Sequence, residues 1–549
     1  MTLKVRYQVL LLLFVVLGVY YPALFGTVNS VDDQKMLQSL LNSQHGQWID
    51  LFTRGSGNNY YRPLLMATFY ADLHLWLLEE SFLHLENVLL HAWNTLWVML
   101  LAREVGKALY PARTFVWAPF CAALLFALHP INTEPVNWIS GRTDVLAGAF
   151  LFPAVWFLLC GLAKGRPVFS SIGALFFLCA CWSKETAVFI FPATAFFCFW
   201  HWRNQENRFW RDGTARLLRH YWAWGVVLLV YFAMRYAAKP VDKGINHVVK
   251  AVGGELYSYL DGLRIFLKAG GFYVKKLFVP WPLNFIIMGA PDWYVGLGVI
   301  FIIAIIIWLC RASLLAMVFL TMACLLSSAL LVPLLNMTWT PLAERYLYLP
   351  SVFFVVGLVF YLAPLLKRFA SDRGVALVII PVLAVFLVST YQRNIIWQDN
   401  LSLYQDTDQK TPNFPTVRNE LALALMKKGR VAEAEAIFAE NKINKNGSER
   451  YYSPVNNALV LWRNKEYEEA RRLFWSAAEG DRRAAPSTLK KYLKLMESWS
   501  LDQKDISPPE WLSSEILRVQ AELFERTADP FWLYRQWRTY LASGDRTTA

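Results

Sequence analysis

The chain has 549 residues, of which 56% are hydrophobic and 16% aromatic, including 24 tryptophans. This composition excludes a soluble multidomain protein and indicates a polytopic membrane protein. The net charge of +13 would suggest a nucleic-acid partner, but the lysines and arginines concentrate in alternate short loops between apolar runs, as the positive-inside rule predicts. We therefore expect no nucleic-acid binding.

Apolar windows of about 20 residues mark helices that can cross a bilayer. They predict an all-α membrane domain over residues 1–391 with about eleven spanning helices, near residues 8–26, 84–102, 115–130, 145–163, 168–183, 187–202, 220–237, 293–310, 315–335, 350–366 and 374–391. Basic residues at every second connection assign those connections and the amino terminus to the cytoplasm. Large loops at 27–83 and 238–292 are then expected outside, the second holding an interfacial helix with a break at Gly270-Gly271.

The chain beyond residue 391 is charged and is expected to be water-soluble and extracytoplasmic, with a linker at 392–410 and a helical domain at 411–549. Residues 421–438 align weakly with residues 457–474, so that Ala434 matches Ala470 and Phe438 matches Phe474. Small residues at a helix contact, with a phenylalanine closing the pair, are typical of tetratricopeptide repeats. The alternative is a generic helical domain.

Polar residues gather at the predicted outer ends of the helices and in the outer loops. Asp32 and Asp33 follow the first helix, and His84, Asn87 and His91 share one face of the second. The remaining charged members are Arg62, Glu134, Arg142, Asp144, Lys184, Glu185, Glu344 and Arg345. Because ionisable groups at a membrane boundary are costly unless paired, their convergence on one face indicates an active site.

Each of these groups also has a purely structural interpretation. Asp32 and Asp33 could cap a helix that begins near Gln34, and His84 and His91 could be satisfied core histidines. The 129–144 connection could be a salt-bridged turn. A divalent cation could bind the histidines and carboxylates, but no ligand spacing is diagnostic, so we assign neither a metal site nor a cofactor.

Cations aligned with carboxylates at a membrane surface suit a reaction between a lipid-phosphate leaving group and a hydroxyl nucleophile. Arginine or lysine would neutralise the phosphate, and a carboxylate would take the proton of the hydroxyl. Sugar transfer from a polyprenyl-phosphate carrier has these requirements. A transporter would instead place ionisable groups near the bilayer midplane within repeated halves, and the sequence shows no such symmetry.

In order and spacing, these motifs resemble the transmembrane and tetratricopeptide-repeat-containing O-mannosyltransferases of the GT-C glycosyltransferase superfamily. The resemblance covers about the first 400 residues, and the repeats of the tail extend it. Its matching stretches are Asp32-Asp33, Tyr61-Arg62-Pro63-Leu64, His84 through His91, His129-Pro130 through Glu134, Gly141 through Asp144, Ser183-Lys184-Glu185 and Glu344-Arg345 through Ser351. The motifs are specific as a set, and no single one is specific alone.

The resemblance implies a sugar donor linked to polyprenyl phosphate, an acceptor hydroxyl on the extracytoplasmic side, and an acidic residue of the first loop as catalytic base. Carried over by position, that base is Asp32 or Asp33. The donor phosphate would be held by Arg345, with Arg142, Lys184 and Arg62 as further candidates. The sugar and acceptor site, assigned by location alone, would comprise Glu134, Asp144, His84, His91, Glu185 and Glu344.

The chain departs from the animal enzymes in its two recognisable repeats, its shorter length and the lack of an endoplasmic-reticulum retention signal at its end. These departures predict a bacterial relative in the inner membrane, with its amino terminus in the cytoplasm and its carboxy-terminal domain in the periplasm. They leave open whether the sugar is mannose, and which acceptor receives it.

The sequence therefore predicts a membrane glycosyltransferase that moves a sugar from a polyprenyl-phosphate carrier to a protein hydroxyl, with the repeat domain binding the acceptor. Membrane lipid is the other expected partner. The alternatives are the same chemistry on a glycan or lipid acceptor, a non-enzymatic membrane scaffold whose repeats recruit envelope proteins, and a transporter or flippase for a lipid-linked sugar.

Overall fold

The structure is a computed structural model, and it places the chain in two compact units, residues 1–412 and 413–549. It describes residues 4–42, 50–53, 60–111, 115–203, 210–238, 259–311, 313–335, 340–369, 372–412, 414–443, 458, 461–462, 466–480, 488–490, 492–493, 495–497, 510–527 and 529–542. These residues form helices and no strand, apart from an isolated bridge between Ile287 and Leu342. The predicted all-α class is confirmed.

Helices fill the first unit, and each of the predicted apolar segments coincides with one. The long apolar helices are α1 (Val5–Tyr20, continued by η1, Tyr21–Phe25), α5 (Glu80–Leu109), α6 (Ala118–Leu128), α8 (Arg142–Lys164), α9 (Pro167–Ser183), α10 (Ile190–Arg203), α11 (Trp210–Ala237), α14 (Tyr294–Arg311), α15 (Leu314–Leu334), α16 (Tyr348–Phe369) and α17 (Asp372–Ile396). The other helices of eight or more residues are α2 (Asp33–Asn42), α4 (Pro63–Leu75), α13 (Tyr259–Phe278) and α18 (Asn400–Lys410), and α3 (Asp50–Thr53) is a single turn.

Within the described residues, six helical segments are long and apolar enough to cross a membrane, namely Val5–Phe25, Ile139–Lys164, Tyr294–Arg311, Leu314–Leu334, Glu344–Arg368 and Gly374–Ile396. Three shorter apolar helices accompany them, at Ala118–Leu128, Pro167–Ser183 and Glu185–Cys198. The protein is therefore an integral membrane protein, as predicted, while the full count of eleven spans stays a prediction. Part of the basic connection near residues 203–219 lies outside the described residues.

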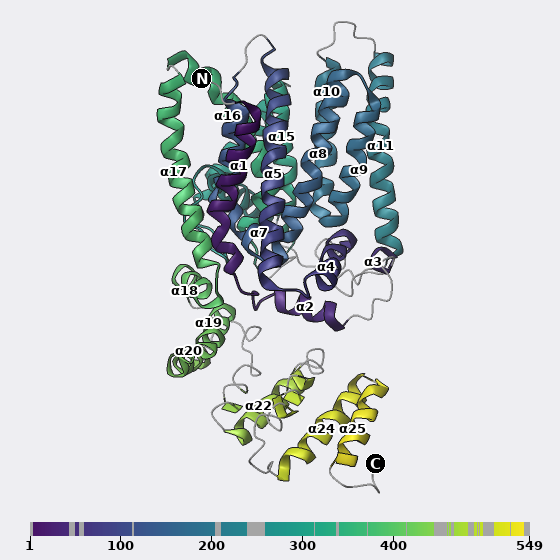
Figure 1. Ribbon diagram of the computed structural model, residues 1–549, viewed down its shortest axis with the longest axis vertical. Coiled ribbons are helices and arrows are strands. Elements are labelled where there is room, and N and C mark those ends of the chain that lie inside the picture. Colours follow the sequence, from purple (N-terminus) through teal and green to yellow (C-terminus); the bar gives the residue numbers. More distant parts are fainter. Residues whose placement is uncertain are drawn as a thin grey trace. The chain divides into compact units, whose positions relative to one another are not determined.

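The spanning helices run side by side as a bundle around α8, which packs against α5 and α9 (Figure 1). Of the apolar window in the α8 span, 78% is buried, against 17% for α14 and for α17. Helix α8 is thus interior, and α14 and α17 present most of their apolar side chains outward, as helices that face lipid do. The short helices α2, α3 and α4 lie together at one end of the bundle (Figure 1).

The predicted break at Gly270-Gly271 is wrong, because α13 continues through both glycines. These residues serve helix packing instead. A Cβ atom on Gly271 would collide with the backbone carbonyl oxygen of Tyr294, and one on Gly298 would collide with that of Leu267. Since small residues let two helix backbones approach closely, Gly271 and Gly298 set the contact between α13 and α14.

Gly271→Ala is expected to destabilise the protein by about 1–3 kcal/mol, because the added methyl meets backbone that cannot rotate away. Gly270→Ala is the matched control. A Cβ there would meet its nearest atom, on Phe301, at 3.8 Å, and alanine favours the helix by up to about 1 kcal/mol. Denaturant unfolding of the two purified variants in detergent tests this, and equal midpoints would contradict the packing role.

The second unit is also helical, with α19 (Pro415–Lys427), α20 (Val431–Ile443), α22 (Tyr467–Gly480), α24 (Glu510–Thr527) and α25 (Pro530–Ala542). Helix α19 packs against α20, and α24 against α25. The residues aligned in the sequence repeat, Ala434 with Ala470 and Phe438 with Phe474, are all buried. Part of the second repeat lies outside the described residues, so its assignment as a tetratricopeptide pair stays a prediction. The expected linker at 392–410 is largely helical, formed by the end of α17 and by α18.

Candidate active site

Five short helices gather at the end of the bundle where α2 begins. They are η2 (Pro130–Asn132), α7 (Thr133–Asn137), η3 (Ile139–Gly141), η4 (Glu185–Phe189) and η5 (Glu344–Leu347). Both η2 and α7 contact η5, and α2 contacts η3. The predicted site loops are therefore neighbours in space, although their sequence positions span more than 300 residues.

The 129–144 connection is a buried and internally bonded segment. Its side chains satisfy nearby backbone groups, since Asn132 Nδ2 donates to Phe126 O at 2.8 Å and Asn137 Nδ2 to Thr133 O at 2.8 Å. Gly141 allows the segment to fold back, because a Cβ there would lie 2.6 Å from Pro135 O. Hydrogen bonds of this kind hold a buried segment, and with it the charged side chains that it carries, in fixed positions.

Arg345 and Glu134 form the ion pair that joins this segment to η5. Arg345 Nη1 donates to Glu134 Oε1 at 2.6 Å, and the Arg345 backbone N–H donates to Glu134 Oε2 at 3.0 Å. The guanidinium lies between aromatic rings, 5.0 Å from the centroid of Trp138 and 4.9 Å from that of Tyr346. Burial raises the pKa of Glu134, the Arg345 charge opposes this, and the nearby Glu344 adds to it.

Two further ion pairs lie beside it. Lys184 Nζ bonds both oxygens of Asp144 at 2.6 Å, and Arg62 holds Glu185 through Nε at 2.8 Å and Nη2 at 2.6 Å. The Lys184 ammonium also lies 5.7 Å from the ring of Tyr346. The Asp144 charge acts on both Arg62 and Arg345, so the three pairs form one electrostatic cluster.

Asp32 and Asp33 differ sharply in environment. Asp33 is buried, and its carboxylate accepts hydrogen bonds from the backbone N–H of Ser140 at 2.8 Å, from the Ser140 hydroxyl, and from the Asn29 N–H at 3.2 Å. Asp32 is exposed at the turn before α2. Its charge, with those of Arg62 and Glu185, acts on the hydroxyl of Tyr60, whose pKa is raised chiefly by burial. Asp32 thus lies within electrostatic reach of the cluster.

Asp33 is expected to make stability depend on pH. Burial raises its pKa from 3.8 to about 6, although the hydrogen bonds from Ser140 and Asn29 oppose the rise. Because the folded protein then binds the proton more tightly than the unfolded chain, the contribution of Asp33 is full below pH 3.8 and is lost as the pH rises through about 6.

Relative to Asp33→Asn, the wild-type protein should therefore lose at most about 3 kcal/mol of unfolding free energy between about pH 4 and 7, since one pKa unit corresponds to about 1.36 kcal/mol. Unfolding measured at several pH values for both proteins checks this. Asp292→Asn is the control, because that carboxylate is exposed and pairs with Arg264 and Lys268. The prediction would be contradicted if the unfolding free energies of the wild type and of Asp33→Asn changed with pH in the same way.

Arg142 bonds residues other than those of the cluster, and its side chain has no exposed surface. Its guanidinium bonds Asp72, Glu86 at 3.0 Å, the side chain of Asn87 at 3.1 Å and the backbone of Leu83 at 3.1 Å. Every nitrogen of the group is thus already bonded to protein. Sequence reasoning missed Asp72, although a carboxylate inside the apolar run 63–75 is a signal of a buried partner.

The two predicted histidines are buried in the bundle on the same face of α5 as Asn87. His91 lies 2.9 Å from the hydroxyl of Tyr348 and 3.3 Å from Ala127 O. His84 packs against the backbone of Gly26, where a Cβ would lie 2.8 Å from His84 Nε2. These contacts support the end of the first span and the start of α16, and neither histidine meets the ion-pair cluster in these contacts.

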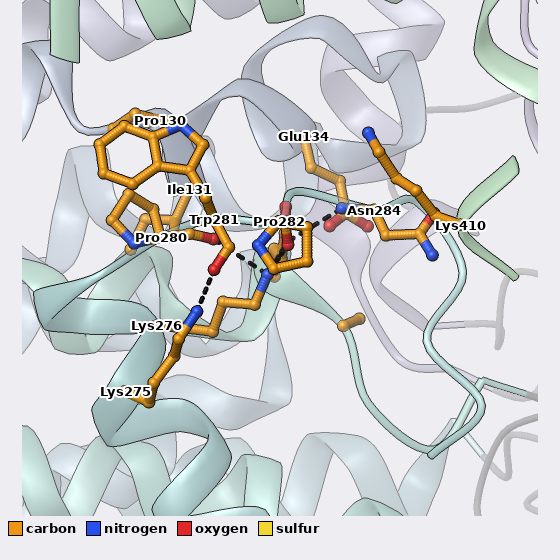
Figure 2. A network of polar contacts seen from close by, with 12 residues as sticks. Pro130, Ile131, Glu134, Lys275, Lys276, Pro280, Trp281, Pro282, Asn284 and Lys410 are labelled. Atoms are coloured by element: carbon orange, nitrogen blue, oxygen red, sulfur yellow. Dashed lines mark hydrogen bonds and ion pairs between the residues drawn. The ribbon is translucent and has the colours of Figure 1, made fainter. Parts of the chain in front are cut away.

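Glu344 is held by a residue that the sequence did not single out for the site. Lys276 Nζ donates to Glu344 Oε1 at 2.6 Å, and the Asn284 N–H donates to the same oxygen of Glu344 at 3.1 Å. Lys276 Nζ also donates to Pro280 O at 3.0 Å, and Figure 2 shows Lys276, Pro280 and Asn284 together. Both charged groups are almost fully buried. The signal that could have identified Lys276 is a lysine at the end of an amphipathic helix, four residues before Pro280.

The arrangement offers acids, bases and cations but no evident metal cage. In the described part of the chain, no three His, Cys, Asp or Glu side chains lie together as metal ligands would. The side chains of Arg345 and Arg62 keep 15% and 17% of their surface exposed, against 6% for Lys184. Arg345 Nη2 has only long contacts, to Thr340 at 3.4 Å and Tyr346 at 3.5 Å. The Nη2 side of the Arg345 guanidinium group can therefore bind an anion.

Comparison with known proteins finds similarity to proteins named protein O-mannosyl-transferases. Protein O-mannosyl-transferase TMTC1 of Homo sapiens is 25% identical over 444 residues, which cover 70% of this chain and 48% of that protein. Protein O-mannosyl-transferase F38B6.6 of Caenorhabditis elegans is 25% identical over 405 residues, covering 71% and 54%. Protein O-mannosyl-transferase TMTC2 of Mus musculus is 39% identical over 113 residues, covering 21% and 12%.

No family model matches the chain. The chain spans about half the length of the two relatives that match most of it, 48% and 54%. The similarity nevertheless confirms the resemblance predicted from the motifs. By sequence, this helical membrane protein is similar to the protein O-mannosyl-transferases of the TMTC group.

Proposed function

We propose that the protein is a membrane glycosyltransferase that moves a sugar from a polyprenyl-phosphate carrier to a hydroxyl group of a protein acceptor on the extracytoplasmic face. The observation that carries this proposal is the exposed carboxylate of Asp32 on a turn that is bonded to Ser140 of the 129–144 segment, which also holds the partly open guanidinium group of Arg345 through Glu134. The similarity to proteins named O-mannosyl-transferases supports the same reaction class.

In this proposal Arg345 is the main ligand of the donor phosphate, and Arg62 assists it. Nη2 of Arg345 is free of strong bonds, whereas Glu134 holds Nη1 and the backbone N–H and thereby fixes the orientation of the group. The phosphate that leaves the sugar gains negative charge, and prepositioned guanidinium donors stabilise that charge in the transition state. Trp138 and Tyr346 keep water from the guanidinium faces.

Asp32 is the base that takes the proton of the acceptor hydroxyl while the acceptor oxygen attacks the sugar carbon and the carrier phosphate leaves. It is exposed, and no side-chain bond occupies its carboxylate in the described contacts, whereas the carboxylate of Asp33 already accepts three hydrogen bonds. Asp33 therefore holds the turn against Ser140, and Asp32 meets the acceptor. The pairs Lys184–Asp144 and Arg62–Glu185 form the wall of the sugar and acceptor site.

Buried or fully bonded residues have supporting roles. Arg142 holds α8 to α4 and α5, and Glu344 holds η5 to α13 through Lys276. His84 and His91 support the helices from which the site loops emerge. We propose that the second unit positions the acceptor, since helical repeats present extended surfaces for peptides, and that the membrane is a bacterial inner membrane with this unit in the periplasm.

The test uses the full chain reconstituted in lipid nanodiscs, with radiolabelled mannose and other sugars linked to polyprenyl phosphate and with extracted envelope proteins as acceptors. Label that enters protein and is released by β-elimination supports the proposal. Label that enters only glycan or lipid would overturn the protein-acceptor form. Movement of the donor across liposomes without turnover would replace the enzyme by a flippase, and no turnover with intact recruitment of envelope proteins would favour a scaffold.

A further inference from the structure

The turn that carries Asp32 is held by a segment about 370 residues away in sequence. We define the acidic loop as residues 28–33 and the clamp as residues 398–404, which includes the start of α18. All of these residues lie within the first unit. The clamp has no role in the chemistry proposed above, yet it makes hydrogen bonds to the first three residues of the acidic loop, Val28, Asn29 and Ser30.

The first half of the clamp bonds the backbone around and within the acidic loop. Asn400 uses both groups of its side-chain amide, because Nδ2 donates to Val28 O at 2.9 Å and Oδ1 accepts from the Ser30 N–H at 3.4 Å. Just before the loop, the Thr27 N–H donates to Gln398 O at 2.9 Å. This pattern fixes the path of the backbone that leads into the loop.

The second half of the clamp is the hydroxyl of Tyr404, a side chain with no exposed surface. It lies 2.8 Å from the hydroxyl of Ser30 and donates to Asn29 Oδ1 at 3.3 Å. The Tyr404 ring lies beside Phe285, with the ring centroids 6.5 Å apart. The ring is therefore held by packing, and its hydroxyl is presented to two consecutive residues of the acidic loop.

Asn29 passes this constraint to Asp33 and to the turn that carries Asp32. Its side-chain oxygen also accepts from the Val31 N–H at 2.9 Å, its backbone N–H donates to Asp33 Oδ2 at 3.2 Å, and its carbonyl accepts from the Gln34 N–H at 3.3 Å. These bonds close the turn of residues 29–34, on which Asp32 is the exposed residue. Side-chain bonds of asparagine to the backbone two residues on are a common way to fix such a turn.

We propose that Tyr404 is a positioning residue of the transfer reaction, which holds the Asn29 turn so that the Asp32 carboxylate is fixed toward the acceptor hydroxyl. This inference rests on the proposed role of Asp32 as base. Tyr404 touches neither donor nor acceptor in this scheme, and it acts through Asn29 and Ser30. The position of a catalytic group matters because a misplacement of about 1 Å can lower a rate about a hundredfold.

Tyr404→Phe is the informative variant, because it removes the hydroxyl and keeps the buried ring. We expect its kcat in the nanodisc transfer assay to fall about tenfold, with the KM for the polyprenyl-phosphate donor unchanged. Tyr110→Phe is the matched control. Tyr110 follows the last residue of α5, whereas His84 lies near the start of that helix. The Tyr110 hydroxyl donates to Phe360 O at 3.0 Å, and its removal should leave kcat unchanged because it is far along α5 from the site.

A double-mutant cycle separates positioning from a merely structural role. If Tyr404 acts through the base, Tyr404→Phe should lower the residual rate of the Asp32→Asn protein by less than twofold, because there is no longer a carboxylate to position. An unchanged kcat for Tyr404→Phe, or the same tenfold loss in the Asp32→Asn background, would overturn the inference. If Asp32→Asn itself keeps full activity, the assignment of the base fails instead, so the two failures are distinguishable.

Discussion

Replacing Asp32 with asparagine should lower kcat for sugar transfer about 10²- to 10⁴-fold, the usual contribution of a positioned general base. The KM for the donor should change little, because Arg345 and Arg62 hold the phosphate in the proposed scheme. Asparagine keeps the shape of the side chain, and Asp32 is exposed. The free energy of unfolding should therefore stay within about 0.5 kcal/mol of the wild-type value. Single-turnover rates with labelled donor provide the measurement.

Two comparisons make this prediction specific. Asp33→Asn should retain more activity than Asp32→Asn and should show the altered pH dependence of stability described above, because the Asp33 carboxylate is already bonded to Ser140 and Asn29. Asp292→Asn should retain full activity, since this exposed carboxylate pairs with Arg264 and Lys268 outside the site. Loss of transfer in Asp33→Asn with retention in Asp32→Asn would exchange the two assignments.

Arg142→Met should destabilise the protein by about 3–5 kcal/mol, the range observed when one member of a buried ion pair is removed. The methionine would leave Asp72 buried without its cation and would leave the side chain of Asn87 and Leu83 O without a donor. Arg142→Lys should recover only part of the loss, because an ammonium cannot reproduce the planar fork of donors. Denaturant unfolding in detergent measures both variants.

The same experiment decides whether Arg142 holds the fold or binds the donor phosphate. If this residue were a phosphate ligand, Arg142→Met would raise the donor KM and leave stability nearly unchanged. Arg264→Met is the control for loss of an arginine, since the Arg264 side chain is 57% exposed and exposed pairs contribute at most about 1 kcal/mol. The double variant Arg142→Met with Asp72→Leu should be more stable than Arg142→Met alone, because it removes the unpaired charge.

The sequence predicted the helices of the membrane unit well, because a long apolar run in lipid has no alternative to an α-helix. Each predicted segment coincides with a helix, from α1 to α17. The prediction failed at Gly270-Gly271, where two consecutive glycines suggested a break in the helix that is now α13. The cost of about 1 kcal/mol for a glycine inside a helix is offset here by the close approach of α14, which no local pattern reveals.

For the site, the sequence alone determined which residue types gather at the ends of the helices. Charged groups in an apolar chain are few, and each must be paired or functional. What it could not determine is which charges pair, because a partner is set by the packing of helices far apart in sequence. The partner of Arg142 is Asp72, that of Lys184 is Asp144, and that of Glu344 is Lys276.

The tertiary structure also separated two aspartates that are equivalent in sequence. Asp33, the first residue of α2, is buried against Ser140 of η3, whereas Asp32, one residue earlier, stays exposed. The physical reason is that adjacent residues at the start of a helix face different directions, and only the neighbouring elements decide which direction is buried. The sequence alone determined a helical membrane protein with a charged site, and the tertiary contacts decided which of its charges hold the fold and which stay open.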